Sequence, residues 1–399
     1  MKILMVNKFL YKNGGSETYM MKLGEYLASI GHEVEYFGMS HEGNCVFNSA
    51  DSYTSDMDFH TASAFEKISM SFKTIYSKEA RQKISLVLDK FQPDAVHLNN
   101  FNYQLTPSII LEIREWEKRN GKNVKIVYTA HDYQLVCPNH MLNNPASNEI
   151  CEKCIGGGFL NCAKGKCIHS SFIKSLFGTL EAYYWNKNKV YANIDTIICC
   201  SEFMKTKLDT NPVLAKKTVA LHNFIQDVSA QNFDKKPYVL YFGRFSQEKG
   251  VKTLLKACRA LPEIRFVFAG SGPLENELGE ADNVSNVGFK SGGDLYNLIA
   301  QARFSVYPSE WYENCPYSVM ESITLGTPVI GADIGGIPEL IENGETGLLF
   351  ESGNAEELKE KIKSLYFDEN ALEKMNASCR KKRFISIEEY TNTLLQYYA

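Results

Sequence analysis

Two cations stand close together in the carboxyl-terminal half of the chain and have the chemistry to hold a phosphorylated ligand. Arg244 and Lys249 share the segment GRFSQEKG, which directly follows the apolar run YVLYF. A guanidinium grips phosphate oxygens with two parallel hydrogen bonds, whereas an ammonium acts as a mobile point charge, so the pair suits a diphosphate. Two solvated surface charges are the plainer interpretation of an isolated Arg and Lys at this spacing.

Two carboxylates follow another apolar run, FSVYP. Glu313 lies before Pro316, and Glu321 lies five residues after that proline. Proline is tolerated in the first turn of a helix, so a helix is expected to begin there, with the free N–H groups near Tyr317 and Ser318 forming an anion site. At 1.5 Å per residue the two glutamates would lie about 12 Å apart along the axis, if all of it were helical. One carboxylate could reach a sugar while the other holds a pair of ribose hydroxyls.

The elements that must position these residues are short apolar strands alternating with amphipathic helices. KILMV, HEVEYF, DAVHL, KIVYTA and DTIICC precede a polar stretch at about residues 226–236, and YVLYF, IRFVFAG, FSVYP and TPVIGA follow it. Strands separated by helices predict parallel sheets with right-handed crossovers. Such sheets bind ligands at the carboxyl ends of their strands, where the charged residues stand. A chain of 399 residues is long enough for two such α/β domains.

Taken together, these motifs resemble family 4 of the retaining glycosyltransferases. The resemblance rests on the pair Glu313 and Glu321, on GR…EKG, on the loop 270–273 and on GGIPELIENGETGLLF, which follow in the family's order over nearly all of residues 237–351. The amino-terminal half matches more weakly, through Gly14-Gly15-Ser16-Glu17 and the strand end YTAHD. The family wording has Gly-Phe-Gly after the first glutamate, whereas NCPY follows Glu313 here, which makes the loop stiffer and leaves the donor sugar open.

The resemblance implies a GT-B fold, in which two Rossmann-like domains face a central cleft and the terminal helix crosses back to the first domain. Residues 1–228 would be the acceptor domain, with a cysteine-rich insertion at 137–169, residues 229–383 the nucleotide-sugar domain, and residues 384–399 the returning helix. The implied catalytic residues are Glu313, His131, Arg244 and Lys249, and the implied donor-binding residues are Gly14, Gly15, Gly243, Gly272, Phe289, Lys290, Asn314, Cys315, Pro316, Tyr317, Ser318 and Glu321.

The activity implied is transfer of a sugar, with retention at the anomeric carbon, from a nucleotide donor to an acceptor. Family habit suggests UDP as the nucleotide and a glycan or lipid-linked acceptor in cell-surface polysaccharide synthesis. No catalytic metal is expected, because Arg244, Lys249 and the helix start near Pro316 would offset the charge of the departing diphosphate. His131 would act near the sugar and the acceptor hydroxyl, with Asp132 able to orient it.

Other classes of protein fit the sequence less well. GxGxxG and the Walker loop are absent, which weakens dehydrogenase and kinase hypotheses. A nucleotide-sugar epimerase of the same fold usually lacks the pair of glutamates, and a glucan phosphorylase would need a pyridoxal-binding lysine and a far longer chain. The net charge of −4 argues against a nucleic-acid binder, which needs a basic face.

Five of the 11 cysteines fall between Cys137 and Cys167. Cys151 and Cys154, two residues apart, could bite one ion, and Cys162 and Cys167 could complete a closed tetrahedral site, which predicts a structural zinc. Cys137 could replace one ligand, and an iron–sulfur cluster would use the same residues. The alternatives are reduced thiols, a redox-labile pair, or a non-enzymatic zinc module as the protein's whole function.

The sequence predicts a cytoplasmic protein, with a peripheral location on the inner face of a membrane as an alternative. The opening MKILMVNKFLYKNGG lacks the features of a signal peptide, and no apolar run reaches the length of a membrane span. Residues 170–191 combine aromatic residues with lysines. A helix of that composition can lie on a membrane. Packing of the helix on its own domain is the favoured interpretation.

Overall fold

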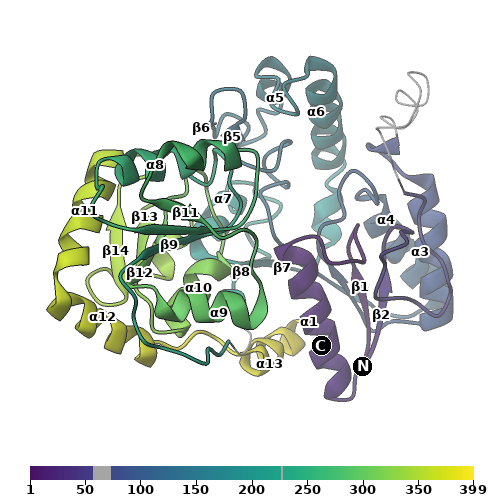
Figure 1. Ribbon diagram of the computed structural model, residues 1–399. Coiled ribbons are helices and arrows are strands. Elements are labelled where there is room, and N and C mark those ends of the chain that lie inside the picture. Colours follow the sequence, from purple (N-terminus) through teal and green to yellow (C-terminus); the bar gives the residue numbers. More distant parts are fainter. Residues whose placement is uncertain (57–72, 226–227) are drawn as a thin grey trace. The chain divides into compact units, whose positions relative to one another are not determined.

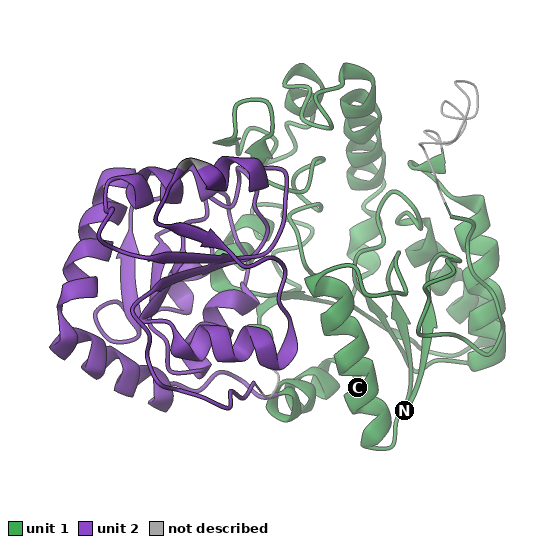
Figure 2. Cartoon of the chain, in the orientation of Figure 1, with its two compact units in different colours: residues 1–223, 387–399 green, residues 224–386 purple. Residues whose placement is uncertain are grey.

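The computed structural model describes residues 1–56, 73–225 and 228–399. The chain divides into two compact units (Figure 2). Unit 1 comprises Met1–Asn223 together with Ile387–Ala399, and unit 2 comprises Phe224–Ser386. Each unit contains one six-stranded sheet and the helices that cover it.

The sheet of unit 1 is parallel throughout, in the order β2-β1-β3-β4-β7-β8. The central strands are buried along nearly their whole length, as in parallel sheets with helices on both faces. For example, β1 pairs with β3 in a register that sets Leu4 opposite Val96, both fully buried. The strands are β1 (Lys2–Val6), β2 (Glu33–Phe37), β3 (Ala95–Leu98), β4 (Lys125–Ala130), β7 (Thr196–Cys199) and β8 (Thr218–Ala220).

The helices of unit 1 begin and end where local chemistry permits. Ser77 caps α3 by accepting a hydrogen bond from the Ala80 N–H, and Gly121 ends α4 in the left-handed conformation. The helices are α1 (Gly15–Ser29), α3 (Lys78–Phe91), α4 (Ser108–Asn120), α5 (Leu160–Lys164), α6 (Phe172–Lys187) and α7 (Glu202–Leu208), with a 3-10 turn at Val190–Asn193. A short hairpin of β5 (Asn143–Asn144) and β6 (Glu149–Ile150) precedes α5.

The last helix, α13 (Ile387–Tyr398), belongs to unit 1, although it follows unit 2 in the sequence. Tyr390 exchanges a hydrogen bond of 2.6 Å with Tyr19 of α1, and Tyr398 hydrogen-bonds to His97 of β3. All four side chains are buried. The predicted return of the terminal helix to the amino-terminal domain is therefore confirmed.

Unit 2 is built on a second parallel sheet, in the order β11-β10-β9-β12-β13-β14. Its strands are β9 (Val239–Phe242), β10 (Phe266–Ala269), β11 (Val284–Asn286), β12 (Phe304–Tyr307), β13 (Val329–Ala332) and β14 (Gly347–Phe350). Its helices are α8 (Val251–Arg259), α9 (Gly292–Gln301), α10 (Tyr317–Thr324), α11 (Ala355–Phe367) and α12 (Glu369–Lys381), with 3-10 turns at Glu275–Glu280 and Ile337–Glu339.

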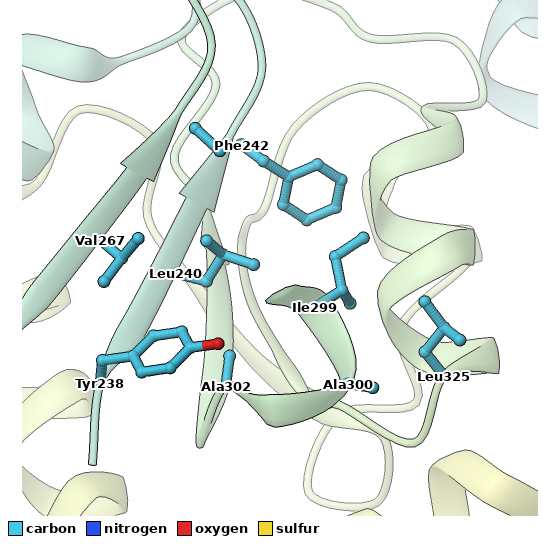
Figure 3. Packing of buried hydrophobic residues seen from close by; sticks show 9 residues of the cluster. Tyr238, Leu240, Phe242, Val267, Ile299, Ala300, Ala302 and Leu325 are labelled. Atoms are coloured by element: carbon cyan, nitrogen blue, oxygen red, sulfur yellow. The ribbon is translucent and has the colours of Figure 1, made fainter. Parts of the chain in front are cut away.

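The core on one face of this sheet joins β9 to α9. Figure 3 shows Leu240 and Phe242, alternate residues of β9, pointing toward Ile299 of α9. Alternate side chains of a strand share one face, so β9 contributes two large residues to this layer while its neighbours face the other side. The core fixes β9 and therefore the loop that follows it, which carries Arg244 and Lys249.

None of the helices in the described ranges combines the length and apolarity needed to cross a membrane. The two parallel α/β sheets and the returning helix agree with the fold predicted from the sequence.

Candidate functional site

The loops after β9 and β12 are tied together through their backbones. The N–H of Glu310 donates to the carbonyl of Glu248 at 2.9 Å. Gly250 has a φ of +70°, and a Cβ there would stand 1.7 Å from the carbonyl oxygen of Pro308. Only glycine allows this approach, so the two loops meet as one surface at the carboxyl edge of the sheet.

Glu313 is the centre of that surface. Its Oε1 accepts hydrogen bonds from the Lys249 ammonium at 2.5 Å, from Trp311 Nε1 at 2.6 Å and from the Ser309 hydroxyl at 2.9 Å. The Tyr307 side chain hydrogen-bonds to the carboxylate as well. Only 7% of Glu313 is exposed. Four donors around one buried carboxylate hold it in a single position.

Two opposing effects set the ionisation of Glu313. Burial raises the pKa of its carboxyl group, but the charge and hydrogen bond of Lys249, together with the donors on Trp311 and Ser309, outweigh burial. The net result is a pKa below the ordinary value for glutamate. Glu313 is therefore a fixed negative charge at neutral pH.

The two cations of the GRFSQEKG loop differ in their contacts with other side chains. Lys249 pairs with Glu313, and its ammonium lies 5.0 Å from the ring centre of Trp311. Arg244 is exposed, and among the described residues its guanidinium has no hydrogen-bond or ion-pair partner. Its backbone is held, because Tyr241 donates its hydroxyl to the Arg244 carbonyl at 2.8 Å. The sequence predicted the charges but could not show that Lys249 pairs with Glu313.

Helix α10 begins at Tyr317, one residue later than Pro316, which is its N-cap and supplies no side-chain acceptor. Glu321 lies one turn inside this helix and is half-buried. Burial raises the pKa of Glu321 to about 7. Within the described part of the chain its carboxyl group has no ion-pair or hydrogen-bond partner, so this group can accept hydrogen bonds from a ligand once it is ionised.

The side chains near the start of α10 divide into buried and accessible ones. Cys315 is buried, and its thiol contacts the Met320 sulfur at 3.7 Å, so its side chain belongs to the core. Asn314, Tyr317 and Ser318 are each half-buried. If Cys315 contributes to ligand binding, its backbone does so.

The loops after β10 and β11 border the GRFSQEKG loop. A Cβ on Gly272 would stand 2.4 Å from the Phe245 carbonyl, so glycine lets the two loops touch. The N–H of Gly243 donates to the Ala269 carbonyl at 3.0 Å. Phe289 is 75% exposed, and its neighbour Lys290 is also exposed. An exposed ring of this size offers a stacking surface.

His131 lies at the end of β4 in unit 1, and Asn99 orients it. Its Nε2 lies 2.9 Å from Asn99 Oδ1, which makes Nε2 the donor and leaves Nδ1 unprotonated. Its ring packs edge-on against Tyr19, 5.0 Å between centres. Burial lowers the pKa of His131 to about 4, so the imidazole is neutral at physiological pH.

Asp132 does not orient His131, contrary to the expectation from sequence. Its Oδ2 lies 3.1 Å from Nδ1 of His140 instead, in the turn that follows. Neither Asn99 nor Trp311 was singled out from the sequence. A polar residue after a buried strand, as Asn99 stands after β3, is a signal that could have found the first of them.

Gly14 and Gly15 stand at the start of α1, where Gly14 is the N-cap. A Cβ on Gly15 would meet nothing within 4 Å. The chain's own packing therefore does not require glycine at this position.

The cysteines of the insertion form part of a small core. Cys154, Cys162 and Cys167 are buried and pack with Phe159 and Ala182. Cys162 and Cys167 hydrogen-bond to each other, and burial raises the pKa of Cys154 to about 12.

Zinc binds thiolates. Burial raises the pKa of Cys154, whereas the hydrogen bond with Cys162 lowers the pKa of Cys167 to about 7. Across residues 1–56, 73–225 and 228–399, no three side chains of His, Cys, Asp or Glu are placed to hold a metal ion. The structure thus does not support the predicted zinc site at Cys151, Cys154, Cys162 and Cys167.

Comparison with known families accounts for both units. A family model described as Glycosyltransferase Family 4 matches residues 13–227, and one described as Glycosyl transferases group 1 matches residues 224–382. The chain belongs to glycosyltransferase family 4. Members of this family are retaining enzymes that use nucleotide-sugar donors. Membership sets aside the epimerase, phosphorylase and zinc-module alternatives.

Solved structures confirm the GT-B fold. The chain superposes on sucrose-phosphate synthase from Thermosynechococcus elongatus with a TM-score of 0.68 at 18% identity, covering 100% of this chain and 98% of that one. Anabaena HepE in complex with UDP and glucose gives a TM-score of 0.65 at 15% identity, covering 99% and 98%.

Curated relatives match in part. An uncharacterized glycosyltransferase of Methanocaldococcus jannaschii is 29% identical over 51% of this chain and 58% of its own length. The sulfoquinovosyl transferase of Arabidopsis thaliana is 32% identical over 37% of this chain and 30% of its own. A Campylobacter jejuni N,N'-diacetylbacillosaminyl-diphospho-undecaprenol alpha-1,3-N-acetylgalactosaminyltransferase is 34% identical over 35% and 38%. The matches span 30% to 58% of the lengths of these relatives.

Proposed function

We propose that this glycosyltransferase takes its sugar from a UDP-sugar held in unit 2 and passes it to a glycan or lipid-linked acceptor. The observation that carries the proposal is the arrangement at the carboxyl edge of the unit 2 sheet. There an ionised, immobilised Glu313 lies beside a cation, while the unpaired Arg244 and Glu321 keep their binding capacity.

The diphosphate is assigned to Arg244 and Lys249. Arg244 offers a complete guanidinium fork, because no described residue occupies it. Lys249 has three N–H donors and uses one of them on Glu313, so two remain for phosphate oxygens. Negative charge grows on the diphosphate as it departs, and two preorganised cations stabilise that charge more in the transition state than in the ground state.

The transferred sugar is assigned to Glu313. Glycosyl transfer passes through a state with positive charge at the anomeric carbon, which a fixed carboxylate stabilises. Three donors converge on Oε1 and hold the carboxylate in position, so its fixed negative charge is its proposed contribution. Glu313→Gln keeps the shape and removes this charge.

The nucleoside is assigned to Glu321 and Phe289. An ionised Glu321 would accept hydrogen bonds from the two ribose hydroxyls, and the exposed Phe289 ring, with Lys290, would border the base. UDP is favoured because Anabaena HepE was crystallised with UDP and glucose. Gly14 and Gly15, in unit 1, remain proposed donor-loop residues.

His131, at the end of β4, is proposed to act on transfer and not on nucleotide binding, which is assigned to the charged residues of unit 2. A neutral imidazole oriented by Asn99 can hydrogen-bond to a sugar or acceptor hydroxyl. The acceptor class follows the Campylobacter relative, whose name specifies a diphospho-undecaprenol-linked sugar, and a relative from Erwinia amylovora named for amylovoran biosynthesis.

Isothermal titration calorimetry with UDP, ADP and GDP tests the donor site. We expect UDP to bind most tightly, Arg244→Ala to weaken binding of the diphosphate, and Glu321→Gln to weaken binding of UDP and of uridine alike. Glu277→Gln, a partly exposed glutamate of the same unit, is the matched control. Binding of all three nucleotides unchanged in both site variants would refute the assignment.

A further inference from the structure

Helix α6 differs from an ordinary surface helix in which of its side chains are buried and which are exposed. The side chains that it buries include small and polar ones, Ser175, Gly178, Thr179 and Ala182. Its exposed side carries most of the large apolar residues, although Trp185 is buried. A helix on the surface of a globular domain normally does the reverse.

The exposed residues form one continuous stripe. The exposed positions 173, 180, 184 and 187, with the half-buried Leu176 after the first, follow one another at intervals of three or four, which places them on one helix face. Phe172 and Tyr183 lie at the margin of this face, and Leu160 of the adjacent α5 is exposed as well. The apolar members exposed by 38 to 66% are Leu160, Phe172, Ile173, Leu180, Tyr183 and Tyr184. We call this set the α6 stripe.

The opposite face of α6 is already packed closely against its own domain, so the stripe is not the face that the domain covers. Thr179 donates its hydroxyl to the Phe159 carbonyl at 3.1 Å, and a Cβ on Gly178 would stand 2.4 Å from Ile168. Trp185 is fully buried and stacks on Tyr76 at 5.8 Å. Rotating α6 to bury the stripe would break this close packing. The predicted packing of α6 on its own domain is therefore confirmed, and the stripe lies on the face that this packing leaves exposed.

The charged residues around the stripe favour an anionic membrane over a protein as its binding partner. Residues 151–189 contain six lysines and two glutamates, and all six lysines are exposed. Of the glutamates, Glu181 is buried and Glu152 pairs with Lys207 at 2.6 Å. Lysine is depleted in protein–protein interfaces, whereas apolar and aromatic residues flanked by lysines characterise helices that lie on anionic membranes. Figure 1 shows α5 and α6 side by side at one end of unit 1, so the stripe and the lysines share one region.

We propose that the α6 stripe docks this protein onto an anionic phospholipid surface. The helix would lie in the plane of the membrane interface, with Ile173 and Leu180 inserted below the headgroups. Tyr183 and Tyr184 suit the headgroup level, because their rings are apolar and their hydroxyls polar. Lys174 and Lys187 would contact lipid phosphates. This role goes beyond sugar transfer and does not depend on it.

Vesicle flotation of the full chain tests the docking surface. We expect the protein to float with vesicles of phosphatidylcholine and phosphatidylglycerol and not with phosphatidylcholine alone. The double variant Ile173→Ser, Leu180→Ser should lower the partition coefficient about tenfold or more. Lys174→Gln with Lys187→Gln should lower it by about fivefold per charge at low salt. Leu86→Ser and Lys118→Gln, at exposed positions of α3 and α4, are the matched controls and should stay within about twofold of wild type.

Thermal unfolding and UDP binding of the α6 variants should match wild type, because every substituted residue is exposed and lies outside the donor site. Flotation of the serine double variant equal to wild type overturns the proposal. So does a wild-type protein that ignores anionic vesicles but self-associates through the stripe, which would make it a protein interface. Neither result affects the assignment of the donor site, which the nucleotide titrations decide.

Discussion

Removing the ion pair between Lys249 and Glu313 should strongly lower the free energy of unfolding of unit 2. Glu313 is 7% exposed, and Lys249 supplies the only cation that the structure places against its carboxylate, among the described residues. Lys249→Met preserves the length of the side chain and removes the charge. Breaking a buried pair by removing one partner costs about 3–5 kcal/mol, because the other charge stays buried.

The stability lost in Lys249→Met should increase with pH. In the wild type the pKa of Glu313 is lowered, so its stabilising contribution is present above the pKa of about 4.3 in the unfolded chain and is lost as pH falls below it. In Lys249→Met, burial acts without that cation and raises the pKa. The loss of stability should then be largest at about pH 8 and smaller at about pH 5, where Glu313 can take up a proton.

Differential scanning calorimetry of the full chain at both pH values measures this effect. We expect unit 2 to unfold about 10 °C lower in the variant at the higher pH, since a unit of its size loses about 2–4 °C per kcal/mol. The control is Lys252→Met, which removes a more exposed pair with Glu277, worth about 1 kcal/mol at most. A Lys249 variant no less stable than this control, or a loss independent of pH, would refute the buried-pair reasoning.

Three further predictions follow from the structure. Because the pKa of Glu321 is about 7, affinity for UDP should rise between about pH 6 and pH 8, and Glu321→Gln should flatten that rise in calorimetric titrations. His131→Ala should lower the transfer rate at least about tenfold while UDP affinity stays within twofold, and full transfer activity would return His131 to a structural role. Metal analysis of protein purified without chelator should find less than about half an equivalent of zinc per chain. A full equivalent of zinc, together with loss of thermal stability in EDTA, would show that the insertion cysteines rearrange around an ion.

The sequence predicted the fold and the cationic loop because both depend on local patterns. Short apolar strands alternating with helices define parallel sheets, and the charges of Arg244 and Lys249 follow such a strand directly. The partner of Lys249 is 64 positions away, on a loop that reaches it only once β9 and β12 are adjacent in the sheet. Pairings of this kind depend on tertiary structure, which periodicity does not encode.

Two features of unit 1 could not be predicted from sequence patterns, for the same reason. The spacing of Cys151, Cys154, Cys162 and Cys167 shows which thiols can be near one another, but it does not distinguish ligands from core residues. In α6, the periodicity reveals an apolar stripe without showing which side of the helix the domain covers. Gly178 and Thr179 occupy that side because α5 and its flanking turns lie too close for larger residues.

The central claim is that unit 2 activates a nucleotide sugar through the fixed charge of Glu313. Proton NMR of UDP-sugar hydrolysis without acceptor tests it most directly, because the spectrum reports both the rate and the anomer that is released first. We expect at least one UDP-hexose to be cleaved with the α-anomer appearing first, and Glu313→Gln to slow cleavage about a hundredfold or more while UDP still binds. Release of the β-anomer first, or cleavage by Glu313→Gln at the wild-type rate, would contradict the account.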